Sequence, residues 1–256
     1  MSEVEPIAAS YPPAADLLRH RVILVTGAGD GIGRAAALAF ARHGATLVLL
    51  GRSQKKLVAV YDAIEAAGGP KPAILVFNLE TEAETEYQNL ANTLEQALGR
   101  LDGLLHNAAH LPFLSRIDDY DAEAWRQVLQ VNLTAPFLLT QACLPLLRRA
   151  ADASLIFTLD AVAQVSAYWG AYGVSKAGLE GLMHILAEET RNANTLRVNA
   201  IQPCPTRTAL HARVYPGRNP DELPDPEALM AVYLYLMGPD SQGVTGRIFT
   251  ARPGAL

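Results

Sequence analysis

Short apolar runs alternate with longer amphipathic segments along most of the chain. The apolar runs are rich in valine, isoleucine and leucine and have the length of single strands, and the segments between them have helical spacing. This alternation predicts an α/β fold: a Rossmann-type, doubly wound parallel sheet of about seven strands in a three-layer αβα arrangement. The expected strands are residues 21–26, 46–50, 73–77, 101–106, 154–159, 196–201 and 247–251.

Capping residues indicate where two of the helices begin. Ser53 precedes a helical segment that closes at Gly68, and Asp121 precedes a long segment that continues through residue 149. Serine and aspartate accept hydrogen bonds from the first free N–H groups of a helix, and glycine favours its end. Pro136 lies inside the long segment and should kink it, because proline removes a helical hydrogen bond.

The chain is expected to form one domain with two irregular segments. Residues 1–19 contain acidic residues and prolines, and we expect a flexible leader before a single domain over residues 20–256. Residues 205–225 are rich in proline and turn-forming residues. A loop of that length in a compact domain is usually functional, so we expect a substrate lid near these residues.

Composition and charge exclude several classes of partner. The formal net charge is −5 and 50% of the residues are hydrophobic, which predicts a globular protein without an electrostatic footprint for nucleic acid or an anionic membrane. No apolar run is long enough to cross a bilayer, and no signal peptide is evident. Cys143 and Cys204 have no metal-site spacing. We expect free thiols, no metal and a cytoplasmic protein.

The glycine-rich stretch "TGAGDGIG" over residues 26–33 provides the first chemical signal. Gly27 follows the first predicted strand, and Gly31 and Gly33 open the next helix. A pyrophosphate can lie on a helix N-terminus only where no side chain blocks the backbone N–H groups, which glycine permits. Alone, such a turn is also compatible with a βα connection that binds no ligand.

Four further motifs follow in a fixed order. They are "HNAA" at 106–109, Asn132 in "VNLTAP", "YGVSK" at 172–176 and "PCPTRT" at 203–208. Together with the spacing T-G-x-x-x-G-x-G, this set resembles the short-chain dehydrogenase/reductase family over about residues 20–255. The wording "WGAYGVSK" and "VYLYLMGPDS" further resembles the bacterial YciK-like oxidoreductase subgroup of that family.

The resemblance implies a nicotinamide dinucleotide cofactor. Gly51 occupies the position where NAD sites carry an acidic residue, and Arg52 follows it, which favours NADP(H) and leaves NAD(H) possible. Asp30 stands where NADP-preferring relatives often have a basic residue, and Arg52 could also be a solvated turn residue. The implied cofactor-binding residues are Gly27, Asp30, Gly31, Ile32, Gly33, Arg52, Asn78, Leu79, Asn107, Ala108, Tyr172, Lys176, Pro203, Thr206 and Thr208.

By the same resemblance, Tyr172 is the catalytic acid and base. A phenol is a weak base at neutral pH, so the tyrosinate needs a nearby cation. Lys176 follows at i+4 on the same helix face, where its ammonium would lower the pKa of the phenol. Asn132 resembles the asparagine that supports a proton relay, although a buried structural asparagine is an alternative.

The family's catalytic serine is absent. It should stand at position 159 or 160, where this chain has Leu159 and Asp160. An ionised carboxylate only accepts hydrogen bonds and would raise the pKa of Tyr172, whereas a protonated carboxyl could donate as serine does. Three interpretations are open: Asp160 substitutes for the serine, a hydroxyl such as Thr158 or Ser166 replaces it, or catalysis is impaired.

The expected function is NADP-dependent hydride transfer between nicotinamide and an alcohol or carbonyl substrate. The alternative is a catalytically impaired dinucleotide-binding regulatory or scaffold protein. Apolar residues near the site suggest an apolar substrate pocket, and basic residues of the lid would favour an anionic group if they point inward, although most could be solvated. The apolar set is Tyr168, Trp169, Leu210, Val214 and Tyr215, and the basic set is Arg207, His211, Arg213 and Arg218.

The resemblance also implies a homodimer or homotetramer. The long helix from residue 121 and the helix that carries Tyr172 should pack against symmetry mates. Their apolar positions agree with this arrangement but agree equally with an ordinary core face. Those positions include Leu179, Leu182, Met183 and Leu186.

Overall fold

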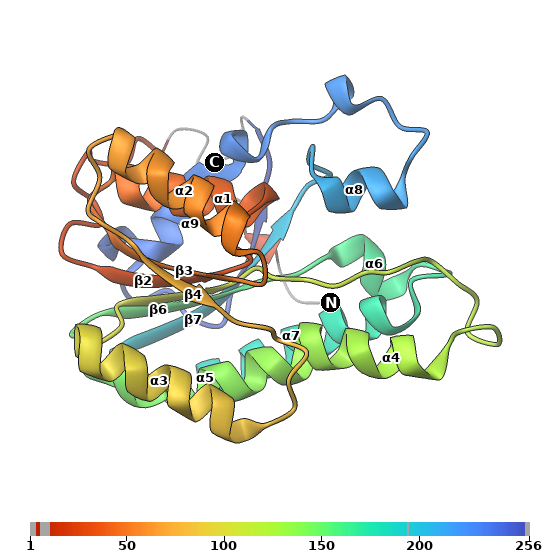
Figure 1. Cartoon of the computed structure of the whole chain (residues 1–256), viewed down its shortest axis with the longest axis horizontal. Coiled ribbons are helices and arrows are strands. Elements are labelled where there is room, and N and C mark those ends of the chain that lie inside the picture. The colour runs from red at the N-terminus through yellow and green to blue at the C-terminus, as the bar shows by residue number, and fades with distance from the viewer. Residues whose placement is uncertain (1–3, 6–10, 194, 254–256) are drawn as a thin grey trace.

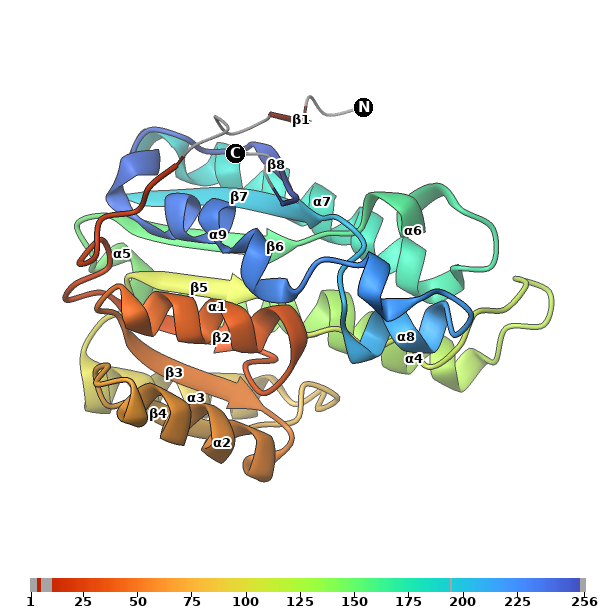
Figure 2. The ribbon, with the colours of Figure 1, turned by 90° about the horizontal axis from the view of Figure 1, so that it is seen from above.

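A computed structural model describes residues 4–5, 11–193 and 195–253. Within these residues, eight parallel strands form one sheet in the order β1-β8-β7-β6-β5-β2-β3-β4 (Figures 1 and 2). Seven of them fall on the seven predicted strands, which confirms the predicted sheet, and β1 is a two-residue addition at the edge. The strands are β1 (Val4–Glu5), β2 (Val22–Thr26), β3 (Thr46–Gly51), β4 (Ala73–Val76), β5 (Gly103–His106), β6 (Ala153–Thr158), β7 (Leu196–Pro203) and β8 (Ile248–Ala251).

Helices cover both faces of the sheet. In Figure 1, α1, α2 and α9 lie on one face, and α3, α5 and α7 lie on the other. The helices are α1 (Gly31–Arg42), α2 (Gln54–Ala66), α3 (Glu84–Leu98), α4 (Ala122–Leu129), α5 (Ala135–Arg148), α6 (Ala161–Val165), α7 (Gly170–Thr190), α8 (Ala209–Val214) and α9 (Met230–Met237). Short 3₁₀ turns cover Arg191–Ala193, Pro220–Glu222, Pro226–Leu229 and Pro239–Ser241.

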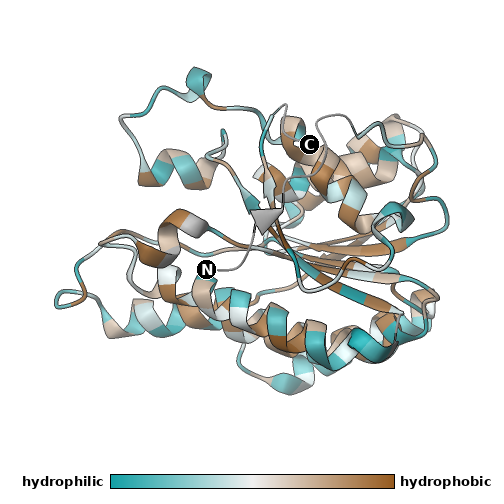
Figure 3. Ribbon diagram, turned by 180° about the vertical axis from the view of Figure 1, so that it is seen from behind, coloured by the Kyte–Doolittle hydropathy of each residue, from teal (hydrophilic) through white to brown (hydrophobic). Residues whose placement is uncertain are grey.

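Each central strand is buried on both faces, which explains its continuous apolar sequence. In β2, Ile23 and Val25 belong to the core with α1, α2 and α9, whereas Leu24 belongs to the core with α3, α5 and α7. Alternate side chains of a strand point to opposite faces, so neither face can be polar. Figure 3 shows the strands as mainly hydrophobic, with hydrophilic residues on the outer sides of the helices.

The two predicted helix caps are confirmed. Ser53 accepts a hydrogen bond from the Lys56 N–H at 3.4 Å and starts α2. Asp121 accepts one from the Ala124 N–H at 2.7 Å and starts α4.

The long segment after Asp121 is divided where the sequence predicted a kink. A π-helical turn over Gln130–Thr134 separates α4 from α5, and Pro136 lies in the first turn of α5. Proline has no N–H, so the carbonyl of Asn132 has no α-helical donor at this point. The wider turn accommodates that loss, and π-turns of this kind are frequent at functional sites.

Part of the predicted leader is packed against the domain. Leu18 is fully buried, and its N–H donates to the His43 carbonyl at 2.9 Å. The Tyr11 ring meets the Tyr235 ring edge-on, with centroids 5.4 Å apart. The packed chain therefore extends further toward the N-terminus than the predicted boundary at residue 20. Residues 1–3 and 6–10 of the predicted leader lie outside the described residues.

The strand order places a crevice at one end of the sheet. The chain moves outward from β2 to β4 and then returns to β5 on the other side of β2, so the order reverses between β2 and β5. Ligands of doubly wound sheets bind beyond the carboxyl ends of the strands at such a reversal. In Figure 2, α8, α6 and α4 lie beyond this end of the sheet. The predicted lid near 205–225 contains α8 and one 3₁₀ turn.

Candidate functional site

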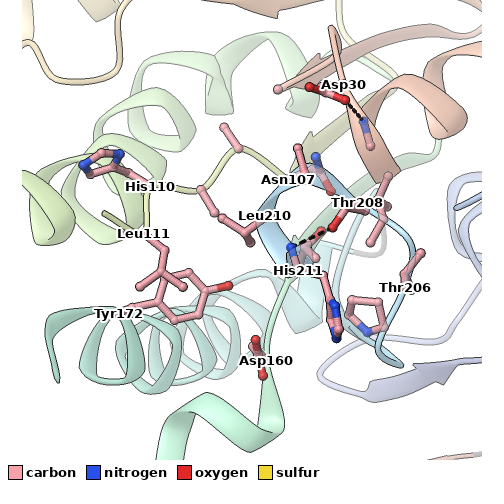
Figure 4. A pocket seen from close by; sticks show the side chains of 18 of the residues that line it. Asp30, Asn107, His110, Leu111, Asp160, Tyr172, Thr206, Thr208, Leu210 and His211 are labelled. Atoms are coloured by element: carbon pink, nitrogen blue, oxygen red, sulfur yellow. Dashed lines mark hydrogen bonds between the residues drawn. The ribbon is translucent and has the colours of Figure 1, made fainter. Parts of the chain in front are cut away.

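A cavity of about 900 Å³ lies at the carboxyl ends of the strands, where the strand order reverses. Its wall comes from the turn after β2, the ends of β3 and β4, the segment after β5, the start of α6, part of α7, and the chain from β7 through α8. Figure 4 shows part of this wall. Every predicted cofactor-binding residue lines the cavity except Gly33, which lies beneath the glycine-rich turn.

The glycine-rich turn packs so closely that side chains are excluded from it. A Cβ atom on Gly33 would lie 2.3 Å from the Gly27 carbonyl oxygen. Gly27 has a φ of +67°, and a Cβ there would lie 3.0 Å from the Ala108 Cα. Asp30 caps α1 by accepting from the Gly31 N–H at 2.8 Å. The turn thus brings bare backbone and a helix N-terminus to the cavity, which fits a dinucleotide pyrophosphate.

One threonine joins the ends of β2 and β5. The Thr26 hydroxyl oxygen accepts from the Asn107 N–H at 3.0 Å and from the Ala108 N–H at 3.1 Å. The same hydroxyl donates to the Leu105 carbonyl at 3.3 Å. These bonds hold the segment after β5 against the glycine-rich turn, so both sides of the crevice have a fixed separation.

Two ion pairs lie at the end of the cavity next to β3. Arg52 donates to Glu80 at 2.6 Å, and Lys56 donates to Asp30. The hydrogen bond from Lys56 is the main reason that the pKa of Asp30 lies below its ordinary value. Gly51, at the end of β3, contributes no side chain. This end of the cavity therefore combines two cations with the absence of the acidic residue that binds a ribose 2′-hydroxyl in NAD sites.

The remaining predicted cofactor residues are held by local hydrogen bonds. Asn78 accepts from the Glu80 N–H at 3.2 Å through its side-chain oxygen, and its neighbour Leu79 is buried. Thr208 caps α8 by accepting from the His211 N–H at 3.1 Å. The Thr206 hydroxyl donates to the Cys204 carbonyl at 2.6 Å.

Tyr172 and Lys176 lie side by side on α7 at the cavity wall, and both are buried. The Lys176 Nζ is 5.5 Å from the centre of the Tyr172 ring and donates to the Thr158 carbonyl at 2.7 Å. Burial lowers the pKa of Lys176 to about 8. Burial, followed by the charge and hydrogen bonding of Asp160, raises the pKa of Tyr172 above its ordinary value.

Asp160 lies directly before α6 and faces the cavity beside Tyr172 (Figure 4). Its carboxylate caps α6 by accepting from the Ala163 N–H at 3.1 Å. Among the residues weighed as replacements for the missing serine, Thr158 lines the cavity as Asp160 does, whereas Ser166 is not part of its wall. The geometry therefore brings Asp160, and not Ser166, to the cavity beside Tyr172.

The side chain of Asn132 is occupied by protein contacts. Its oxygen accepts from the His110 N–H at 2.7 Å, and its amide nitrogen donates to the His110 carbonyl at 2.9 Å and to the Ser175 hydroxyl at 3.2 Å. Asn132 is not part of the cavity wall. Its side chain thus anchors the segment after β5 to the π-turn.

The part of the cavity beyond Tyr172 is largely apolar. The Trp169 ring contacts the rings of Tyr172 and Tyr215, with centroids 5.5 Å and 6.3 Å apart. Of the predicted apolar pocket residues, Tyr168 is exposed and is not part of the wall. The other four predicted residues line the cavity: Trp169, Leu210, Val214 and Tyr215.

Sequence reasoning missed two residues of the cavity wall, Lys56 and His110, whose side chains can bind ligands. Lys56 pairs with Asp30, a residue distant in sequence, and only its position on the first turn of the helix after Arg52 could have indicated it. His110 follows the "HNAA" motif, but nothing in the local sequence shows that its ring faces the cavity. Both depend on contacts that form only when β3 and β5 are placed in the sheet.

A family model for short chain dehydrogenases matches residues 21–219. The chain belongs to this family of oxidoreductases. It is 45% identical over 245 residues to the uncharacterized oxidoreductase YciK of Escherichia coli, covering 95% of this chain and 96% of that protein.

Solved structures of the family superpose on this chain over nearly their whole length. A short chain dehydrogenase from Salmonella enterica has a TM-score of 0.92 at 45% identity, covering 95% of this chain and 100% of that one. An Escherichia coli structure complexed with NADPH has a TM-score of 0.91 at 45% identity, covering 94% and 100%. These matches confirm the resemblance that the sequence motifs indicated.

Other functional features are not found within the described residues. No cluster of three or more histidine, cysteine or acidic side chains there could hold a metal ion. None of the helices in that part of the chain is long and apolar enough to cross a membrane. Cys143 is buried and Cys204 is half-buried, both are free thiols, and burial raises the pKa of Cys143 to about 12.

Proposed function

We propose that the chain is an NADP-dependent oxidoreductase that interconverts an alcohol and a carbonyl compound. The observation that carries this proposal is the buried pair of Tyr172 and Lys176 on one wall of a cavity whose other end is the glycine-rich turn. When bound there, the nicotinamide supplies the hydride in reduction and accepts it in oxidation. The residues of this chain position both reactants and move the proton.

Tyr172 moves the proton. In carbonyl reduction, its hydroxyl donates a proton to the substrate oxygen while the hydride reaches the carbonyl carbon, so that an alcohol forms and a phenolate is left. The ammonium of Lys176, 5.5 Å from the ring centre, stabilises that phenolate. A proton then returns to the phenolate from solvent. Asn132 supports this return through its backbone carbonyl, which Pro136 leaves without an α-helical donor.

The preference for NADP rests on Arg52 and Lys56. Both cations line the cavity at the end of β3, where a ribose 2′-phosphate would lie, and Gly51 offers no carboxylate to a 2′-hydroxyl. A guanidinium fork suits a phosphate. Two relatives were solved with this cofactor: the Escherichia coli structure complexed with NADPH and a Shigella flexneri structure complexed with NADP, the latter 44% identical to this chain.

Asp160 supports a second candidate function. A charged Asp160 beside Tyr172 opposes the phenolate and offers the substrate oxygen no donor, which favours a dinucleotide-binding regulatory or scaffold protein with impaired catalysis. In its protonated form, the same carboxyl would donate to the substrate oxygen and take the place of the serine. Thr158, which also lines the cavity, is the remaining hydroxyl that could do so.

Binding and turnover are measured separately to test these functions. NADPH and NADH are titrated into the protein by nicotinamide fluorescence, and then diacetyl and phenanthrenequinone are offered as carbonyl probes. We expect tighter binding of NADPH, turnover with at least one probe, and loss of turnover without loss of binding in Tyr172→Phe. If the wild type binds the cofactor without turnover and Asp160→Ser gains turnover, the result supports the second candidate, a dinucleotide-binding protein with impaired catalysis. Failure to bind either cofactor contradicts both functions.

We also infer a homodimer or homotetramer built on α5 and α7. Leu179, Met183 and Leu186 are buried in the core, so they do not supply the contact surface. Phe137 on α5 and Ile185 on α7 are instead 44% and 58% exposed. Large exposed apolar side chains on neighbouring helices favour a contact with a second copy.

A further inference from the structure

The four basic residues of the lid have different roles in the structure. Arg207 pairs with Asp225 at 2.5 Å and with Asp221 at 3.4 Å, so its charge is satisfied within the lid. Arg213 donates to the Leu111 carbonyl at 3.2 Å and joins α8 to the segment after β5. Neither residue lines the cavity. These two arginines hold the lid together and are not available to a substrate.

Arg218 and His211 line the cavity. Within the described residues, the guanidinium of Arg218 has no hydrogen bond or ion pair, and its charge helps to lower the pKa of His211. The His211 ring stacks against Tyr215 with centroids 4.9 Å apart, and its Nε2 is sealed from solvent without a partner in the same part of the chain. A buried polar atom without a partner indicates a ligand contact that the protein alone does not make.

His110 provides a second imidazole on the cavity wall. Its backbone is fixed on both sides by the Asn132 side chain, and its Nε2 is likewise sealed and without a partner among the described residues. Burial, with a contribution from Arg52, lowers the pKa of His110 below its ordinary value. The imidazoles of His110 and His211 are therefore mainly neutral at neutral pH. The positive charge of this region comes from the guanidinium of Arg218.

The negative charges of the cavity are few and lie elsewhere. Its described wall contains two carboxylates, Asp30 at the cofactor end and Asp160 beside Tyr172. The region between Trp169 and Arg218 is thus aromatic on one side and cationic at its rim. Such a region accepts a carbon skeleton that ends in an anion, because the rings cover the skeleton and the guanidinium forms charge-assisted hydrogen bonds with the anion.

We propose that the substrate is an alcohol or carbonyl compound that carries a carboxylate, and that Arg218, with His211, binds this carboxylate. A single guanidinium balances a monoanion, which favours a carboxylate over a dianionic phosphate. His211 donates the second hydrogen bond through its Nε2, for which the described part of the chain offers no partner. This inference rests on the proposed function, because the reacting end of the same substrate must reach Tyr172.

A matched pair of aldehydes tests the inference. Benzaldehyde and its para-carboxyl derivative have the same aromatic body and the same reacting group and differ in one negative charge. With saturating NADPH, we expect the wild type to prefer the carboxylated aldehyde in kcat/KM by about tenfold, and Arg218→Gln to remove the preference by raising KM. Arg207→Gln is the matched control, because that arginine is ion-paired away from the cavity, and it should keep the preference.

If neither aldehyde reacts, ligand binding tests the anion site directly. The complex with NADP is then titrated with para-hydroxymethyl benzoate and with benzyl alcohol, and the shift in Tm is recorded. A shift with the carboxylate alone, lost in Arg218→Gln and kept in Arg207→Gln, supports the anion site even if the proposed catalysis fails. The anion site is overturned if the wild type shows the same kcat/KM or the same shift in Tm with the charged and the neutral compound. It is also overturned if Arg218→Gln lowers these values equally for both compounds.

Discussion

The charge of Lys176 should control the rate of the proposed reaction in a pH-dependent way. Replacing Lys176 by methionine keeps much of the length and volume of the side chain and removes the ammonium beside Tyr172. In the proposed mechanism, oxidation needs the phenolate as base and reduction leaves a phenolate behind, so negative charge develops on the phenol oxygen in the transition state of both directions. Lys176→Met is therefore expected to reduce kcat for oxidation and kcat for reduction near neutral pH.

The size of the effect follows from the geometry. The ammonium lies 5.5 Å from the centre of the ring that carries the phenolate charge. At an effective dielectric constant of about 20, the attraction is about 3 kcal/mol, which corresponds to about two pKa units. The pKa of Lys176 is lowered to about 8, so the ammonium is present below that pH and is lost above it. The wild type should exceed the variant about a hundredfold near pH 7 and only about twofold near pH 10.

The assay compares oxidation and reduction over this pH range. The rate of NADP-dependent oxidation of benzyl alcohol and the rate of the reverse reaction are measured for both proteins at saturating cofactor, with Tyr172→Phe as the control for residual activity. Introducing Lys176→Met into Tyr172→Phe should cause no further loss in the chemical step. A ratio of wild-type to variant rates that does not change with pH would show that Lys176 does not act through the phenol.

Three further predictions concern the cofactor and the assembly. Arg52→Ala and Lys56→Ala should each raise the Kd for NADPH about tenfold and leave the Kd for NADH unchanged in fluorescence titrations. An equal rise in both Kd values would contradict the contact with the 2′-phosphate. Gly33→Ala should abolish dinucleotide binding, because its Cβ would lie 2.3 Å from a carbonyl oxygen of the turn. The control Gly181→Ala, with no atom within 4 Å, should raise stability by about 0.5–1 kcal/mol in thermal unfolding. Ile185→Asp should convert an oligomer to monomers in light scattering, and a wild-type monomer would contradict the assembly.

The sequence predicts the sheet because both faces of the sheet are covered. A strand such as β3 carries apolar residues on two sides, so its whole length is visible as one run. The same reasoning cannot find β1, since Val4–Glu5 is too short to show a period and pairs only with β8. Pro136 indicates a disruption of its helix, but the sequence does not show that the π-turn over Gln130–Thr134 accommodates it.

The candidate site was predictable where it depends on local spacing. Tyr172 and Lys176 meet because i and i+4 share a helix face, and Gly27 is required by the turn itself. The roles of the arginines were not predictable, because they depend on partners distant in sequence. Arg207 is paired, whereas Arg218 has no ion pair within the described residues, and only the folded lid distinguishes the two.

The charges around Tyr172 set the protonation state of its phenol before the reaction begins. Burial and Asp160 raise the pKa of the phenol, and the ammonium of Lys176 is too weakly retained to reverse that shift at high pH. The phenol is therefore protonated at neutral pH, and a protonated phenol is the form that donates to a carbonyl oxygen. With NADPH held at the cofactor end, the resting protein is therefore ready for carbonyl reduction, and oxidation first requires the phenol to lose its proton. Asp160 holds that proton on Tyr172, and its replacement by serine should lower the pKa of Tyr172 and, by stabilising the phenolate, speed both directions of the reaction.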